Sequence, residues 1–428
     1  MDRERGPGVP RRKALTAIAA GSAVCALAGA GLSAAGSEGP ARSASGDQAR
    51  TLPGPDVGPP DREAVATVLA NRAAAVRDRD RAAFMATVAA APAGYRQAQA
   101  AMFDNLLKLP LDGWRERFER VVSTTGSAVL VQVTLGYRLR GHDADPLRRN
   151  RHLAFAPRSG TWVITGAGAE RGLPDDAEIW DGGPLTAVRG RTGLVIGDGP
   201  ALAEIARRLD EAVPAVARIT GAAAVRGWRG RVVALVPGTD ARAGALAGGD
   251  RDLGGIAALA TVAPTAGGPG ADRVVIAPGT FGRLNDLGRD VVLTHELTHV
   301  ATGGARDGRT PIWLIEGFAD YVGYHGMPVS VPSAARELRR EVAAGRLPAG
   351  LPGRTAFDAA ASGRLSQSYQ EAWLACRMIA DRYGEASLVR LYRAAGRRSE
   401  AAALREVLGL TPARFTAEWR DYLRRELR

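Results

Sequence analysis

The chain has 428 residues, 46 % of them hydrophobic, and a formal net charge of +12. This length is too great for one ordinary hydrophobic core, so we expect two or three domains, and the hydrophobic fraction excludes a chain that is disordered throughout. The cations are almost all arginines scattered among acidic residues, without a run of five or more, which favours a solvated basic surface and argues against a nucleic-acid partner.

The N-terminus has the composition of an export signal. Arg11, Arg12 and Lys13 precede the uncharged stretch from Ala14 to Ala35, which is mostly Ala, Gly, Leu, Ile and Val. Over residues 1–35, basic residues are followed by an apolar stretch and then by small residues, and this order predicts a signal peptide. The paired arginines resemble a twin-arginine signal. The uncharged stretch is also long enough to span a bilayer, so an uncleaved membrane anchor is the alternative. We expect an exported protein, secreted or held at the cell surface.

Two further segments follow the export signal. Residues 36–60 contain Gly, Ser, Ala and several prolines without an apolar period, which predicts a flexible linker. In residues 61–170, apolar residues spaced three and four apart predict helices as far as Pro110, and strands are predicted after it. These strands are Phe118–Ser123, Ala128–Leu139, Arg151–Ala156 and Trp162–Thr165. Helices followed by antiparallel strands predict an α+β domain.

The order of these elements, with its ending HLAFAPRSGTWVITG, resembles the NTF2-like (SnoaL-like) cone fold. The resemblance covers residues 61–170 and rests on the pattern of elements. It implies a curved sheet that can hold a small ligand or serve as a docking domain. A role in packing alone is the alternative for this region.

Residues 180–428 form the second predicted domain, a mixed sheet followed by helices and therefore again α+β. Strands are expected at Leu194–Ile196, Arg231–Val236, Ile256–Val262 and Val274–Ala277, with an amphipathic helix over Ala201–Ile219. Helical patterns dominate from Arg289 onward. Cys376 lies on an apolar helical stripe and is expected to be buried. The other cysteine, Cys25, falls in the export segment, which excludes a disulfide framework and a cysteine zinc cluster in the mature chain.

The segment Val291 to Val300 contains the pattern H-E-x-x-H. Residues four apart share a face of a helix, so His295 and His299 can reach one metal ion. Glu296 is turned by about 100° from His295 and can approach a metal-bound water without binding the metal. Apolar neighbours predict a buried helix that ends at Gly303. Two buried, hydrogen-bonded histidines without a metal are the alternative.

A second helix begins fourteen residues after His299, with the sequence WLIEGFADYV. Glu316 and Asp320 are its only charged residues, and their spacing places them on one face. Carboxylates on an apolar helix need partners, and a zinc site would provide them. Glu316 would be the third ligand, and Asp320 would accept the N–H group of a ligating histidine. Exposure to solvent or pairing with Arg309 is the alternative.

The two segments together, HELTH and WLIEGFADY, resemble the gluzincin metallopeptidases, and most of all the bacterial peptidase-MA-like group. The resemblance covers about residues 185–390. It implies a gluzincin-like zincin domain with one catalytic Zn²⁺ on His295, His299 and Glu316, and Glu296 as the general base. The metzincin pattern, which has a third histidine six residues after the second, fails because that position is Ala305.

The predicted chemistry does not identify the residue that donates a hydrogen bond to the oxyanion. A His₂Glu zinc site keeps a fourth position for water, and the intermediate of amide hydrolysis needs a hydrogen-bond donor. Many gluzincins use a Tyr or His from the later helical part, and the candidates here are Tyr324, His325 and Tyr369. For Tyr369 and His325, a structural role without any part in catalysis is the alternative.

The sequence thus predicts an exported zinc metallopeptidase that acts on a peptide or protein substrate. Two other functions stay open. One is an exported binding protein in which the zinc only holds the fold, although such a site does not need Glu296. The other is a zinc hydrolase that cleaves amides in cell-wall polymers.

Overall fold

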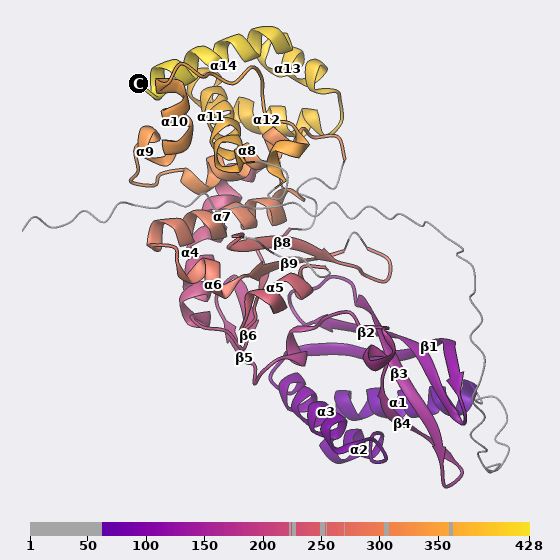
Figure 1. The fold of residues 1–428 in the computed structure, drawn as a ribbon. Helices are drawn as coiled ribbons and strands as arrows, with labels where there is room; N and C mark the ends of the chain where they lie inside the picture. The colour runs from indigo at the N-terminus through magenta and orange to yellow at the C-terminus, as the bar shows by residue number, and fades with distance from the viewer. Residues whose placement is uncertain are drawn as a thin grey trace, which may run out of the picture.

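The computed structural model describes residues 62–221, 224, 228–248, 253, 255–268, 270–303, 308–358 and 363–428. The predicted export segment and linker, residues 1–35 and 36–60, lie outside the described residues. Among the described helices, none combines the length and the hydropathy needed to cross a bilayer. Figure 1 shows three tiers: an N-terminal α/β region, a second sheet with its helices, and a helical C-terminal region.

The N-terminal region consists of three helices and a four-stranded antiparallel sheet in the order β1-β2-β3-β4. Its elements are α1 (Arg62–Asp78), α2 (Arg81–Ala86), α3 (Ala93–Leu106), β1 (Leu111–Thr125), β2 (Ala128–Leu139), β3 (Leu147–Arg158) and β4 (Thr161–Ala167). The side chain of Asp80 accepts a hydrogen bond from the amide of Ala83 and so begins α2. The apolar stripe of α1, with Val65 and Leu69, packs on the sheet.

The second sheet has five strands in the order β5-β6-β7-β9-β8. They are β5 (Thr186–Arg189), β6 (Gly193–Gly197), β7 (Val232–Val236), β8 (Ala258–Ala263) and β9 (Ala271–Ile276). The pairs β6-β7 and β7-β9 are parallel, and β5-β6 and β8-β9 are antiparallel, so the predicted mixed sheet is confirmed. Helix α4 (Leu202–Thr220) connects β6 to β7, and the short helices α5 (Asp240–Leu246) and α6 (Pro278–Gly282) follow.

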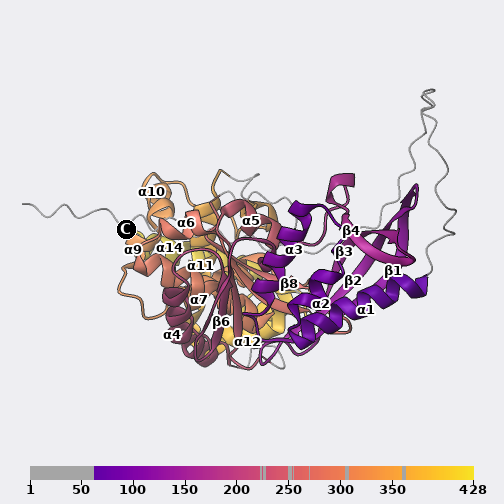
Figure 2. The same cartoon turned by 90° about the horizontal axis from the view of Figure 1, so that it is seen from below.

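Both faces of this second sheet are buried. On β6, Val195 packs with α4 and the C-terminal helices, whereas its neighbours Leu194 and Ile196 pack with the N-terminal region. Strands covered on both faces are apolar at every position, as the runs in β6 and β7 are. The two predicted domains therefore share a hydrophobic cluster. The views in Figures 1 and 2 agree that α3 lies beside the second sheet.

Buried polar groups also join the two regions. The side-chain amide of Asn105, on α3, donates to the carbonyls of Trp180 and Gly183 and accepts from the amide of Leu185. Arg273 on β9 forms a buried ion pair with Asp143, which follows β2, at 2.8 Å. Because these buried groups take hydrogen-bond partners from the other region, they help to fix the N-terminal region on the second sheet.

The C-terminal region is helical, which confirms the predicted order of a mixed sheet followed by helices. Its helices are α7 (Asp286–Thr302), α8 (Ile312–Tyr324), α9 (Val331–Ala334), α10 (Arg336–Ala343), α11 (Leu365–Tyr383), α12 (Glu385–Ala395), α13 (Glu400–Leu408) and α14 (Pro412–Glu426). Helix α7 lies between the second sheet and the remaining helices (Figure 1). Cys376 on α11 is buried, as its apolar stripe predicted.

Candidate metal centre

Helix α7 carries the H-E-x-x-H pattern into the interior. The side chain of Asn285 accepts a hydrogen bond from the amide of Gly288 and begins the helix. Gly303, with φ of +77°, ends it in the left-handed conformation that glycine favours. All residues from Val291 to Thr302 are buried. The buried hydroxyls of three threonines donate to the carbonyl four residues earlier, and these are Thr294, Thr298 and Thr302.

Helix α8 lies close to its neighbours because it contains two glycines at the contacts. A Cβ atom on Gly323 would lie 3.0 Å from the carbonyl oxygen of Val291 on α7. A Cβ atom on Gly317 would lie 2.3 Å from the carbonyl oxygen of Ala372 on α11. These positions have no room for a side chain, so glycine brings α8, and with it Glu316, against the histidine helix.

Three candidate ligand atoms converge between α7 and α8. The Nε2 atom of His295 lies 2.9 Å from Nε2 of His299. The Oε2 atom of Glu316 lies 3.3 Å from Nε2 of His295 and 3.5 Å from Nε2 of His299. All three side chains are buried. The structure thus brings together the three residues that the two sequence segments predicted as ligands.

Two of these separations fit a bound metal ion. Ligand atoms held about 2.0–2.2 Å from a tetrahedral metal lie about 3.3–3.6 Å from one another, which includes the 3.3 and 3.5 Å between Glu316 and the two histidines, whereas the two imidazole nitrogens, 2.9 Å apart, lie closer together than this range. Neither carboxylate oxygen of Glu316 accepts a hydrogen bond from the residues that the structure describes. A buried carboxylate without such partners is costly, and a metal ion would remove that cost. The group of His295, His299 and Glu316 could therefore hold a metal ion.

The charge of Glu316 also suits a ligand. Burial alone would raise the pKa of this carboxyl, but the rings of His299 and His295, in their protonated form, outweigh burial and lower its pKa to about 2. The carboxylate is then ionised at neutral pH. Metal ligands must be deprotonated, so no proton has to be removed from Glu316 before a cation binds.

No family model, curated protein or solved structure matches this chain. The chemistry of the site is therefore inferred from its own residues. A buried pair of imidazole nitrogens and a carboxylate oxygen is a donor set for a transition-metal ion, and it leaves part of the coordination sphere for another ligand.

Asp320 lies on the other side of the His295 ring. Its Oδ1 atom is 2.7 Å from Nδ1 of His295. The carboxylate therefore accepts the Nδ1–H group, which leaves Nε2 of the same ring to face His299 and Glu316. Asp320 is buried on the same face of α8 as Glu316.

Glu296 is buried next to the candidate ligands and is outside the three-residue ligand group. Its Oε2 atom accepts a hydrogen bond from the amide of Ala260 at 2.6 Å. Ala260 belongs to β8, the edge strand of the second sheet. The hydrogen bond holds the Glu296 carboxylate between the histidine helix and this edge strand.

The three candidate oxyanion donors lie in two different places. Tyr324 and Tyr369 line a small hollow together with His295 and Asp320. The ring of Tyr369 is centred 6.2 Å from the ring of His295. His325, by contrast, lies 3.7 Å from Glu385. The two tyrosines are therefore beside the ligand group, and His325 is engaged with α12.

Two features of the site were not predicted from the sequence. The contact between Glu296 and Ala260 joins a side chain to a backbone amide, and a backbone amide has no sequence signature. The glycines of α8 were visible, but helical glycine is read as a weak helix former unless the neighbouring helix is known. The small residue Gly317 directly after Glu316 is the signal that could have indicated close helix packing.

Proposed function

We propose that this chain is an exported zinc metallopeptidase, with zinc held by His295, His299 and Glu316. The observation that carries the proposal is the convergence of the three ligand atoms, separated by 2.9, 3.3 and 3.5 Å, beside a glutamate on the same helix. A site that only stabilises a fold needs four protein ligands and no adjacent base. Three ligands and Glu296 favour catalysis.

Zinc is the metal that this donor set favours. Two imidazole nitrogens and one carboxylate oxygen are the three-ligand set of catalytic zinc sites in metallopeptidases. Calcium and magnesium prefer sites made of oxygen atoms only, whereas His295 and His299 offer nitrogen atoms. The geometry adds support, because the 3.3 and 3.5 Å that separate Glu316 from the two histidines suit tetrahedral coordination.

The roles of the protein groups follow from their positions. A bound zinc ion would supply Lewis-acid chemistry, polarising the scissile carbonyl and acidifying a water molecule. Glu296 accepts the proton of the attacking water and returns a proton to the leaving nitrogen. The amide of Ala260 orients the Glu296 carboxylate for both transfers. For the hydrogen bond to the developing oxyanion we propose Tyr369 or Tyr324, which line a hollow beside His295.

The edge strand β8 favours a peptide as the substrate. It is the outermost strand of the second sheet, and its Ala260 amide contacts Glu296. An extended peptide can pair with the edge of a sheet, and a peptide added at β8 would lie beside Glu296. The resemblance of HELTH and WLIEGFADY to the gluzincin peptidases supports the same choice.

The remaining parts of the proposal concern the other regions. The N-terminal region, with α1 to α3 packed on a four-stranded antiparallel sheet, has the element order expected of an NTF2-like fold. Export rests on the composition of residues 1–35. A secreted or surface-held enzyme would meet protein substrates outside the cell.

Metal analysis and casein cleavage by the wild type, Glu296→Gln and Glu316→Gln test the proposal. We expect about one zinc ion per chain in the wild type and in Glu296→Gln, and less in Glu316→Gln. Glu296→Gln should lose about 10²–10⁴-fold in activity, because it removes only the proton transfer. Glu211→Gln, an exposed substitution on α4, serves as the control.

The outcomes separate the alternatives. Zinc without cleavage in the wild type would favour a binding protein with a structural metal. Activity on cell-wall polymers without activity on casein would favour a cell-wall amide hydrolase. A wild-type protein without zinc, or a Glu296→Gln variant as active as the wild type, would refute the proposal.

A further inference from the structure

The outer edge of β8 is accessible over a short stretch next to the metal centre. The amide of Ala260 points away from β9 and donates to Glu296. Because backbone groups alternate in direction along a strand, Val262, two residues farther on, turns its N–H and C=O groups to the same side. These two groups bond to no other described residue, and Val262 is 45 % exposed. Ala258 is buried in the other direction, so a peptide can reach the edge only from Ala260 onward.

The N-terminal region closes this accessible stretch at one end. The next residue with outward-facing groups is Pro264, which has no N–H group. Its carbonyl accepts a hydrogen bond at 2.8 Å from the amide of Arg148, near the beginning of β3. The amide of Ala266 then donates to the carbonyl of Pro146 at 3.1 Å. The hydrogen bonds that β8 can offer to a peptide therefore end at Val262.

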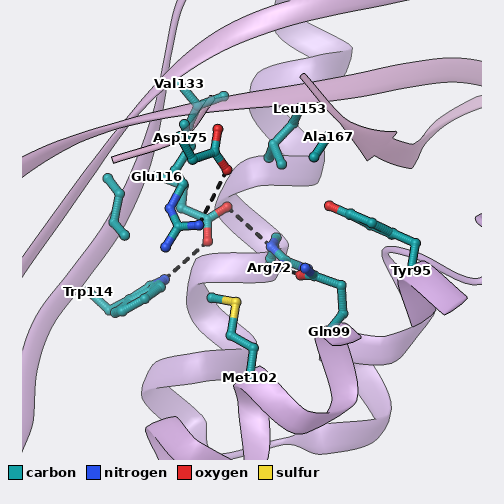
Figure 3. Close-up of a pocket in the computed structure, with 12 residues that line it drawn as sticks. Arg72, Tyr95, Gln99, Met102, Trp114, Glu116, Val133, Leu153, Ala167 and Asp175 are labelled. Atoms are coloured by element: carbon teal, nitrogen blue, oxygen red, sulfur yellow. Dashed lines mark hydrogen bonds and ion pairs between the residues drawn. The ribbon is translucent and has the colours of Figure 1, made fainter. Parts of the chain in front are cut away.

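Buried ion pairs hold the closed end in place. Arg273 on β9 lies opposite Thr261 of β8 and pairs with Asp143, which precedes β3. Within the N-terminal region, Arg72 on α1 lies 3.4 Å from Glu116 on β1, and Figure 3 shows the two side chains facing each other. Moving β3 aside would disturb these buried contacts, which is costly. A peptide on β8 must therefore end at β3 or leave the edge there.

A carboxylate lies at the closed end. Asp145 precedes Pro146 in the chain, and its carboxylate lies so close to Gly268 that an added Cβ atom would overlap it. Asp145 is partly exposed and forms no ion pair within the described part of the chain. The nearby cation of Arg148 is 3.7 Å from Glu119. Asp145 attracts an ammonium group and repels a carboxylate, so this end favours the N-terminus of a peptide.

The direction of strand pairing leads to the same end of the peptide. One residue of an antiparallel peptide can bond to both the N–H and the C=O group of Val262, and antiparallel pairs are slightly more stable than parallel ones. In that direction the peptide runs from β3 toward Ala260 and Glu296. About three of its residues fit between them, opposite Ala263, Val262 and Thr261, so the bond that reaches Glu296 follows about the second or third residue.

We propose that the enzyme cleaves peptides near a free N-terminus and releases fragments of about two or three residues. This inference rests on the proposed function, because it concerns how a peptide cleaved at the zinc site is placed. The ammonium group of the substrate lies near Asp145, and the residue opposite Val262 bonds to its backbone. Each cleavage consumes one water molecule, leaving a carboxylate on the short fragment and a new amino group on the remaining chain.

Mass spectrometry of the products tests where the cleavage occurs. The full chain with zinc is incubated with synthetic peptides of mixed sequence that have a free N-terminus, and with the same peptides after N-terminal acetylation. We expect cleavage after about the second or third residue of the free peptides. Acetylation should lower kcat/KM by about tenfold or more, because it removes the charge that Asp145 attracts.

Two substitutions of Val262 test the pairing with β8. Val262→Pro removes the outward N–H group but keeps the pairing with β9, which the residues on either side of it make. Its kcat/KM for the free peptides should be about tenfold below that of Val262→Thr, which keeps the N–H group. Both variants should bind zinc like the wild type, because Val262 is outside the ligand group.

A third substitution tests the closed end. Asp145→Asn should reduce the preference for free over acetylated peptides, since it removes the anion. Asp421→Asn, at an exposed position on α14, should keep the preference of the wild type. If Val262→Pro fails to fold and binds no zinc, the positions of cleavage and the Asp145→Asn variant still decide.

The outcomes separate this inference from the proposed function. Cleavage throughout the peptides, at equal rates with and without acetylation, would overturn the inference and leave the proposed function intact. Cleavage near the C-terminus would likewise overturn the inference alone. A folded Val262→Pro variant as active as Val262→Thr, or an Asp145→Asn variant with the wild-type preference, would also overturn it. If neither casein nor any peptide is cleaved, both fail.

Discussion

His295 is held between two carboxylates of one helix, since its Nδ1 atom lies 2.7 Å from Oδ1 of Asp320 and its Nε2 atom lies 3.3 Å from Oε2 of Glu316. The two carboxylates are four residues apart on α8 and therefore share a face. Asp320 fixes the ring with the proton on Nδ1, and the lone pair of Nε2 is then directed at the candidate metal position.

The first prediction concerns Asp320. Asp320→Ala removes the acceptor for Nδ1–H, so His295 can rotate or change tautomer, and metal affinity should fall by about 10–100-fold. Asp320→Asn keeps an acceptor oxygen without the charge, so its metal affinity should lie between those of Asp320→Ala and the wild type. Affinity is measured by competition with a chromogenic chelator. Asp421→Ala, at an exposed position on α14, is the control. An Asp320→Ala variant with wild-type affinity would contradict the role of Asp320.

The second prediction concerns the approach of α8 to α11. In Gly317→Ala, the new Cβ atom would lie 2.3 Å from the carbonyl oxygen of Ala372 and 3.0 Å from Sγ of Cys376. Moving these backbone atoms apart costs free energy, so the free energy of unfolding should fall by about 1–3 kcal/mol, as measured by urea denaturation. Gly94→Ala on α3 meets no atom within 4 Å and should leave stability unchanged or slightly higher. Equal effects of the two substitutions would refute the packing argument.

The parts of the site that the sequence predicts are those with a local period. His295 and His299 are four apart on one helix, and Glu316 and Asp320 are four apart on the next, so their shared faces follow from helix geometry alone. We inferred that the two helices meet because buried carboxylates need partners. The structure brings the two pairs together between α7 and α8.

Other features depend on contacts that no local pattern encodes. Strand β5 is short and partly exposed, so its four residues lack the alternation that marks a strand. The beginning of β1 at Leu111 was missed because Gly113 and the register shift between Asp112 and Arg115 interrupt the pattern. The packing of the N-terminal region on the second sheet was also missed, because an apolar run such as β7 does not say what covers each face.

The third prediction tests how the two regions are joined. Asp143 and Arg273 form a buried pair at 2.8 Å, with side-chain exposures of 1 % and 6 %. Asp143→Asn leaves the Arg273 cation buried without its anion, so the free energy of unfolding should fall by about 3–5 kcal/mol. Replacing both residues, with Asp143→Leu and Arg273→Met, should recover most of this loss because no charge is left buried. Urea denaturation measures each variant.

An exposed ion pair between an arginine and an aspartate serves as the control for the buried pair of Asp143 and Arg273. Arg81 and Asp104 lie 2.9 Å apart with side-chain exposures of 53 % and 52 %. Asp104→Asn should therefore change the free energy of unfolding by less than about 1 kcal/mol. If Asp143→Asn costs no more than Asp104→Asn, the buried ion pair does not hold the N-terminal region on the second sheet.

The fourth prediction concerns the pH dependence of stability. Burial raises the pKa of Glu371 on α11 to about 7, although Arg364, 2.9 Å away, opposes the rise. Between about pH 4.5 and pH 7, the unfolded chain has lost this proton while the folded chain keeps it. Stability should therefore fall as the pH rises through this window. Glu371→Gln should flatten the fall in urea denaturation, and the exposed Glu211→Gln should not. An unchanged slope in Glu371→Gln would mean that another group titrates there.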